Sequence, residues 1–214
     1  MIEPEFLRTT RTAYDAMAAR YAELFANALE DFPLDRAMIA AFADFVRTAG
    51  GGTVADLGCG PGHVTSFLHS LGLDASGVDL SAEMIAIARS AHPDLRFEVG
   101  SMTALELGDG TLDGVLARYS IIHTPPELLP QVCAEFHRVL TPGGHLLLSF
   151  QAHDDPAELV ESFDHKVALA YRWSPDRVAG LLTGTGFTEK ARLVRAPRED
   201  ERQFPHAHLL LSKD

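Results

Sequence analysis

The sequence has few of the residues that form metal sites and disulfide frameworks. Its two cysteines, Cys59 and Cys133, have no metal-binding spacing, and we expect both to be reduced thiols. Its 10 histidines include no His-x-x-x-His pair, and no Cys-x-x-Cys accompanies them. His206 and His208 alternate on a probable strand, where exposed or stacked rings are expected. The sequence therefore predicts no metal site.

Basic residues and long apolar runs are also scarce. The chain has 18 lysines and arginines against 30 aspartates and glutamates, a formal net charge of -12, and no basic cluster. A nucleic-acid partner is therefore not expected. No apolar segment approaches the roughly 20 residues that a membrane helix needs. We expect a soluble, cytoplasmic protein without a membrane partner, while its oligomeric state cannot be read from the sequence.

From Thr53 onward, short apolar segments alternate with amphipathic ones. This alternation is typical of a parallel sheet with helices on both faces. Strands are expected near 53–57, 75–79, 95–98, 112–118 and 144–150, after N-terminal helices at 6–29 and 34–48. Two more strands, near 188–195 and 206–212, predict an antiparallel hairpin at one edge. The predicted fold is α/β, a Rossmann-like three-layer sandwich with a seven-stranded, mostly parallel sheet and an N-terminal helical cap.

The stretch from Val54 to Gly62 is the most informative part of the chain. A short apolar run is followed by Gly58, Gly60 and Gly62 at alternate positions. Glycine permits positive backbone dihedrals and lets the main chain approach a ligand closely, because it has no Cβ atom. The stretch therefore predicts a strand, a tight loop and a helix, with a nucleotide-type ligand at the carboxyl end of the strand.

The spacing of the glycines distinguishes a dinucleotide cofactor from a cofactor that carries an ammonium group. A dinucleotide-binding loop has the pattern Gly-x-Gly-x-x-Gly, but here the third glycine comes one residue early and His63 takes its expected place. Asp56 would repel a pyrophosphate, whereas it suits a ligand with an ammonium group. Asp79, 23 positions later, ends the next strand. Its carboxylate can accept hydrogen bonds from both hydroxyls of a ribose.

These features resemble motif I of the class I S-adenosylmethionine-dependent methyltransferases. Tyr14-Asp-x-x-Ala18-x-x-Tyr21 is similar to the N-terminal signature of the small-molecule methyltransferases, of the ubiquinone and menaquinone biosynthesis type. Thr141-Pro142-Gly143-Gly144 looks like their Leu-x-Pro-Gly-Gly element. The resemblance covers nearly the whole chain and is strongest from Val54 to Phe150. It implies in-line transfer of a methyl group to a small organic molecule, with S-adenosylhomocysteine as the product.

The resemblance also implies a division of the chain and a set of cofactor contacts. We expect one domain over 1–214, with a helical cap at 1–50, a cofactor-binding core at 53–150, a substrate-lid insertion at 151–174, and a helix and hairpin at 175–214. Ser101 stands where relatives usually have an acid that binds adenine. The residues assigned to the cofactor are Tyr14, Tyr21, Asp56, Gly58, Cys59, Gly60, Gly62, Asp79, Leu80, Met84, Ser101, Met102 and Arg118.

His123 is the strongest candidate for chemistry. A neutral imidazole can take a proton from the acceptor as the methyl group arrives, although the same histidine could instead cap a helix or pack on the cofactor. Tyr21 is a second candidate on the path to the acceptor. Phe163, Tyr171 and Trp173 are candidates for acceptor recognition because they lie in the insertion. Each of these aromatic residues could instead hold the insertion onto the core.

Two other functions stay open at this stage. A nicotinamide-dependent oxidoreductase is disfavoured by the early third glycine and by Asp56. A non-catalytic module that binds S-adenosylmethionine would share the fold, since a fold alone does not establish a reaction. The sequence identifies neither the acceptor nor whether oxygen, nitrogen or carbon is methylated.

Overall fold

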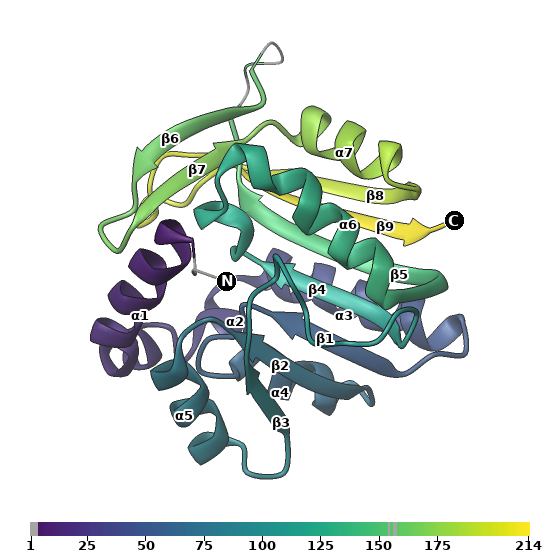
Figure 1. The fold of residues 1–214 in the computed structure, drawn as a ribbon, viewed down its shortest axis with the longest axis horizontal. Helices are drawn as coiled ribbons and strands as arrows, with labels where there is room; N and C mark the ends of the chain where they lie inside the picture. The colour runs from purple at the N-terminus through teal and green to yellow at the C-terminus, as the bar shows by residue number, and fades with distance from the viewer. Residues whose placement is uncertain (1–3, 154, 156–157) are drawn as a thin grey trace.

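The computed structural model describes residues 4–153, 155 and 158–214 (Figure 1). A seven-stranded sheet has the order β3-β2-β1-β4-β5-β9-β8, and its first five strands are parallel. Strands β8 and β9 form the antiparallel pair at one edge, as predicted. The strands are β1 (Thr53–Leu57), β2 (Asp74–Asp79), β3 (Arg96–Val99), β4 (Leu112–Arg118), β5 (Leu140–Gln151), β8 (Phe187–Arg195) and β9 (His206–Lys213).

Helices cover both faces of this sheet, which confirms the predicted three-layer fold. Helices α3 (Pro33–Thr48) and α4 (His63–Ser70) lie behind it in Figure 1, and α6 (Leu129–Val139) and α7 (Pro175–Gly184) lie in front. Alternate strand residues face the two layers, since successive side chains point to opposite sides. Val54 accordingly packs in the core under α3 and α4, while Ala55 packs under α6 and α7.

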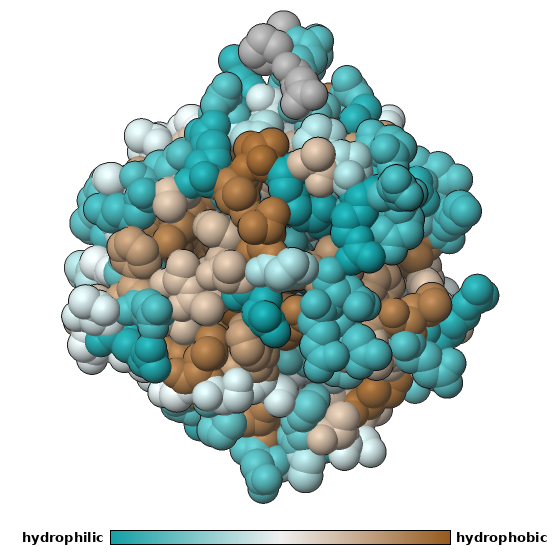
Figure 2. Space-filling model, turned by 180° about the vertical axis from the view of Figure 1, so that it is seen from behind, coloured by the Kyte–Doolittle hydropathy of each residue, from teal (hydrophilic) through white to brown (hydrophobic). Residues whose placement is uncertain are grey.

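Figure 2 shows the molecule from behind, where apolar residues are interspersed with hydrophilic ones. Leu34 and Phe45 of α3 are among the large apolar side chains that stay exposed. None of the helices in the described part of the chain combines the length and apolar content that crossing a bilayer requires.

The N-terminal helix α1 (Glu5–Leu24) packs against α5 (Ala82–Ala91). The hydroxyl of Ser81 caps α5 by accepting a hydrogen bond from the Met84 backbone N–H (3.1 Å) and donates one to Asp15 of α1 (2.6 Å). The helix expected at 6–29 is shorter than predicted, because the chain turns after Leu24 and continues as α2 (Ala28–Asp31). Among its described side chains only Ala18 is fully buried, so α1 acts as a cover.

The insertion after β5 contains a feature that the sequence analysis missed. Strands β6 (Val160–Asp164) and β7 (Leu169–Trp173) form a separate antiparallel hairpin, which lies beside α1 in Figure 1. Ala152 forms an isolated bridge with Trp173, which ties the hairpin to the end of β5. Residues 154 and 156–157 of the expected lid, and residues 1–3 of the expected cap, lie outside the described residues.

The segment Thr141–Gly144 is part of β5, which begins four residues earlier than predicted. The pairing of β4 with β5 is irregular there, because Leu112 pairs with Leu140 whereas Gly114 pairs with His145. Gly143 has a φ of +77°, which a glycine adopts without strain. The glycines therefore form a bulge within the strand instead of ending the preceding loop.

Candidate active site

A cavity lies where α1 meets the carboxyl ends of β1 to β4. The position is the one where open α/β sheets bind ligands. It is lined by Phe6, Leu7, Thr10, Tyr14, Tyr21, Leu57, Gly58, Gly60, Val78, Asp79, Leu80, Met84, Gly100, Ser101, Met102, Thr103, Arg118, Tyr119, Ser120, His123 and Thr124.

Two of the three motif glycines lie at the cavity and have positive φ angles, +79° at Gly58 and +53° at Gly60. A Cβ atom on Gly58 would lie 2.3 Å from the Cβ atom of Ser120, so this position has no room for a side chain. A Cβ atom on Gly60 would meet only the ring of Tyr21, at 4.0 Å. The main chain of Gly60 is therefore open to a ligand from the cavity side.

The other predicted residues of the glycine loop lie away from the cavity. A Cβ atom on Gly62 would be 2.8 Å from Cζ of Phe97, and the side chain of Cys59 lies in the same apolar cluster. Asp56 is buried and accepts a hydrogen bond from the hydroxyl of Thr65 on α4 (2.7 Å). Burial raises the pKa of Asp56 to about 7, although the bond from Thr65 opposes the shift.

The carboxylate of Asp79 is held in place at the end of β2. One oxygen accepts from the backbone N–H of Gly60 and the other from that of Ser81, both at 2.8 Å. Burial raises the pKa of Asp79, and these two backbone hydrogen bonds partly offset the rise. Each carboxylate oxygen has a second lone pair, so both can still accept from a ligand. The arrangement suits a pair of neighbouring hydroxyl groups.

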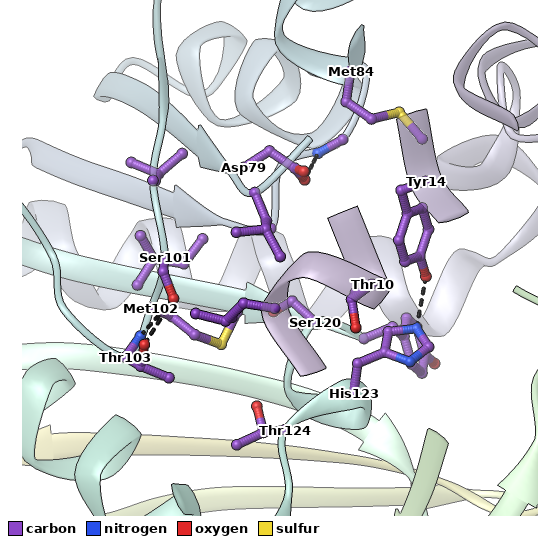
Figure 3. A pocket seen from close by; sticks show the side chains of 18 of the residues that line it. Thr10, Tyr14, Asp79, Met84, Ser101, Met102, Thr103, Ser120, His123 and Thr124 are labelled. Atoms are coloured by element: carbon purple, nitrogen blue, oxygen red, sulfur yellow. Dashed lines mark hydrogen bonds between the residues drawn. The ribbon is translucent and has the colours of Figure 1, made fainter. Parts of the chain in front are cut away.

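Figure 3 shows Ser101, Met102 and Met84 around the same cavity. The hydroxyl of Ser101 pairs with that of Thr103 (2.8 Å) and accepts from the Thr103 backbone N–H (3.2 Å). Leu80 also lines this part of the cavity, and Met84 is buried there at the start of α5. Two methionine thioethers beside a hydroxyl form a pocket suited to a flat, polarisable ring.

His123 lies between α1 and the β6–β7 hairpin and bonds to both. Its Nε2 atom is 2.8 Å from the hydroxyl of Tyr14, and its Nδ1 atom is 2.8 Å from the carbonyl oxygen of Leu169 (Figure 3 shows the first bond). Burial lowers the pKa of His123 and raises the pKa of Tyr14, so both groups are neutral at neutral pH. Tyr21 meets the ring of Tyr14 edge-on, with centroids 5.9 Å apart.

Arg118 lines the cavity but its charge is already paired. Its guanidinium forms a salt bridge with buried Asp35 (2.7 Å) and lies over the ring of Tyr119 (4.8 Å). Burial alone would raise the pKa of Asp35, but the neighbouring His208 and the guanidinium of Arg118 outweigh it and hold that pKa well below its usual range. His206 and His208 are buried instead of exposed, and both stack edge-on against Tyr119. The stacked alternative is thus the correct one.

The three aromatic residues proposed for acceptor recognition are not among those that line the cavity. Trp173 is fully buried in the core, and Tyr171 packs beside it. Phe163 packs against the rings of His165 and Phe204. All three therefore hold the hairpin in place, which is the alternative that the sequence left open. His165, at the tip of this hairpin, meets His123 edge-on at 5.1 Å.

Several cavity residues escaped the sequence analysis. Leu7, Thr10, Tyr14 and Tyr21 share one face of α1, since they follow one another at intervals of three, four and seven residues. Extending the helical period backward from Tyr14 and Tyr21 would have indicated Leu7 and Thr10 as well. Ser120 and Thr124 lie in the segment that follows β4 and contains His123. Their position after the end of a strand was the signal that could have indicated them as cavity residues.

Residues 54–144 match the family model described as a methyltransferase domain. Malonyl-[acyl-carrier protein] O-methyltransferase of Pectobacterium atrosepticum is 30% identical over 57% of this chain and 52% of the relative. The ubiquinone/menaquinone biosynthesis C-methyltransferase of Rubrivivax gelatinosus is 30% identical over 68% of this chain and 57% of the relative. The chain thus spans about half the length of the curated relatives it matches.

The fold of the chain is similar to that of solved structures, including a methyltransferase. The 1,6-didemethyltoxoflavin-N1-methyltransferase of Burkholderia thailandensis superposes with a TM-score of 0.75 at 20% identity, over 100% of this chain and 91% of the other. The PH0226 protein of Pyrococcus horikoshii superposes with a TM-score of 0.62 at 26% identity, over 76% and 82%. In sequence and in fold the chain thus resembles S-adenosylmethionine-dependent methyltransferases, which is the resemblance that the motifs predicted.

Proposed function

We propose that the protein transfers the methyl group of S-adenosylmethionine to a small organic molecule and releases S-adenosylhomocysteine. The observation that carries the proposal is one cavity in which three features meet: the open main chain of Gly60, the fixed carboxylate of Asp79, and the bonded pair of Tyr14 and His123. The names of the relatives, which refer to quinone, acyl-carrier and toxoflavin methyltransferases, support a small acceptor.

The residues present fit this cofactor. The space beside Gly60, which a Cβ atom would enter, suits the methionine part, because main chain and ligand can meet at van der Waals distance there. Asp79 would hold the ribose through its free lone pairs. Ser101, Met84 and Met102 would surround the adenine. Asp56 has no direct access to the cavity, so we assign it an indirect role in ammonium binding through water.

The chain contributes alignment, water exclusion and proton transfer. S-adenosylmethionine supplies a methyl group on a positively charged sulfur, and the displacement mainly requires that the acceptor be held in line and kept dry. Helix α1 covers the cavity with Tyr14 and Tyr21, which limits the access of water. Where the nucleophile carries a proton, the bonded pair of Tyr14 and His123 receives it. The cytoplasmic location and the single-domain organisation stay predictions.

Isothermal titration with S-adenosylmethionine, S-adenosylhomocysteine and NAD tests the cofactor. We expect both adenosyl compounds to bind and NAD not to bind. Asp79→Asn should lose affinity at least tenfold, whereas Asp74→Asn, at the exposed start of the same strand, should bind as the wild type does. Unchanged affinity in Asp79→Asn would remove the ribose role, and binding of NAD alone would overturn the proposal. Release of S-adenosylhomocysteine in an acceptor screen distinguishes an enzyme from a module that only binds.

A further inference from the structure

The hydrogen bonds around His123 fix which of its nitrogens carries the proton. The carbonyl oxygen of Leu169 can only accept, so the Nδ1 atom of the neutral ring carries the hydrogen and donates it. The Nε2 atom then has only a lone pair, and the Tyr14 hydroxyl must donate to it. His123 therefore has no free lone pair to offer a ligand. A proton from the cavity reaches His123 through the hydroxyl of Tyr14.

The same bonds leave the oxygen of Tyr14 ready to accept. Its one hydrogen points to His123, and its lone pairs are available on the cavity side, where Tyr14 is part of the lining. The other titratable ring packed on His123 is His165, from the tip of the β6–β7 hairpin. Burial lowers the pKa of His165 to about 4, so it adds no positive charge beside His123 at neutral pH.

The charges of the cavity limit what kind of acceptor it can take. Among the described lining residues only Asp79 and Arg118 carry a formal charge. In the proposed function the free lone pairs of Asp79 are occupied by the ribose of the cofactor, and Arg118 is already paired with buried Asp35. A charged acceptor would thus lose its hydration without gaining an opposite charge, which is costly. The hydroxyls of Thr10, Ser120 and Thr124 offer hydrogen bonds to a neutral molecule instead.

We propose that the acceptor is an uncharged molecule whose nucleophile carries a hydrogen, such as a phenol or enol, and that Tyr14 is the catalytic residue that takes this proton. The inference rests on the proposed function and deepens it. The new bond forms between the acceptor oxygen and the methyl carbon, while the carbon–sulfur bond breaks and leaves its electron pair on sulfur. The acceptor proton passes to the Tyr14 oxygen as the Tyr14 proton passes to Nε2 of His123. The imidazolium later releases its proton to solvent.

Matched probes test this inference without turnover. Titrations of the chain saturated with S-adenosylhomocysteine use 2-naphthol, 2-methoxynaphthalene, which lacks the hydroxyl hydrogen, and 2-naphthoate, which carries a charge. We expect Tyr14→Phe to weaken the binding of 2-naphthol by about three- to tenfold, which corresponds to the loss of one hydrogen bond. The affinity for 2-methoxynaphthalene should stay unchanged. Tyr171→Phe, outside the cavity lining, should change neither. The anion should bind at least tenfold more weakly than 2-naphthol.

Nitrogen-15 NMR of the histidines gives a second, independent measurement. We expect the proton of neutral His123 on Nδ1, and Tyr14→Phe should raise the pKa of His123, because a bond donated to Nε2 stabilises the neutral ring. An Nε2–H tautomer, or an unchanged pKa, would overturn the relay. If Tyr14→Phe weakens the binding of both neutral probes equally, the proposed role of Tyr14 is wrong. If the anion binds tightly, or if neither neutral probe binds, the proposed acceptor class is wrong. A chain that fails to bind S-adenosylhomocysteine would instead contradict the proposed function.

Discussion

Alanine at two glycines of the same loop should have different effects, mainly on cofactor binding at Gly60 and mainly on stability at Gly62. Gly60 and Gly62 both have positive φ angles, so alanine at either position costs about 1–2 kcal/mol of backbone strain. At Gly60 the added methyl group enters the cavity and meets only Tyr21. At Gly62 it meets Phe97 at 2.8 Å and Ala88 at 3.1 Å, which adds about 1–3 kcal/mol of overpacking.

We therefore expect Gly60→Ala to lose about 1–2 kcal/mol of unfolding free energy. Its methyl group would also displace the cofactor, and a similar overpacking cost of about 1–3 kcal/mol corresponds to roughly a 5- to 150-fold loss of S-adenosylhomocysteine affinity. Gly62→Ala should lose about 2–5 kcal/mol of unfolding free energy. The folded fraction of that variant should bind within about threefold of the wild type, a difference of well under 1 kcal/mol.

Urea denaturation followed by circular dichroism measures the first quantity, and isothermal titration of the folded protein measures the second. If Gly60→Ala binds S-adenosylhomocysteine as tightly as the wild type, the cofactor does not lie against the main chain of Gly60. If Gly62→Ala is as stable as the wild type, Phe97 and Ala88 do not restrict this position, which refutes the predicted overpacking.

Three further predictions concern stability and reactivity. Asp35→Asn leaves the partly buried Arg118 without its counter-charge, while Arg195 keeps Glu201, and it should cost about 3–5 kcal/mol in urea denaturation, whereas Asp44→Asn on the surface should cost under about 1 kcal/mol. Burial and nearby Arg195 lower the pKa of His206 to about 4, so the folded protein favours the neutral form of this histidine. The free energy of unfolding should therefore fall as the pH falls from about 6.5 toward 4. His206→Gln should flatten the pH dependence of unfolding over that window. Burial raises the pKa of both thiols, so a disulfide reagent should label the native chain only as it unfolds.

The parallel part of the sheet could be predicted because its signals are local. Strand β4 has the bounds that the sequence indicated, 112–118, since a short apolar run there is bounded by turn residues on one side. The β6–β7 hairpin has no such signal. Its turn places Lys166, a residue without glycine's freedom, at a φ of +70°. Contacts from distant segments, at Ala152 and His123, hold the hairpin in place.

The site was predictable where a motif fixes the backbone, and less so where packing decides. Gly60 and Asp79 follow from the loop and the strand end, and they are joined by a hydrogen bond as expected of a shared site. The Tyr14–His123 bond joins residues 109 positions apart, which no local pattern indicates. Asp56 shares a sheet face with Val54, two residues earlier, so the period of the strand places it under α4 and not at the cavity.

The buried position of Asp56 makes a last prediction about the balance of stability and function. Its pKa of about 7 in the folded protein compares with about 3.9 in an unfolded chain. The folded state therefore binds the proton more tightly, and stability falls as pH rises from about 4 to about 7. At about 1.4 kcal/mol for each pKa unit, the ionised carboxylate costs up to about 4 kcal/mol above pH 7.

Asparagine keeps the shape of Asp56 and can still accept the bond from Thr65 without becoming charged. Urea denaturation at pH 4.5, 6 and 8 should show Asp56→Asn gaining stability over the wild type as pH rises, by up to about 4 kcal/mol at the highest pH. Parallel pH curves for the two proteins would show that Asp56 does not titrate in this range. If the variant is more stable but binds S-adenosylmethionine more weakly, the chain retains a destabilising buried charge because the cofactor needs it.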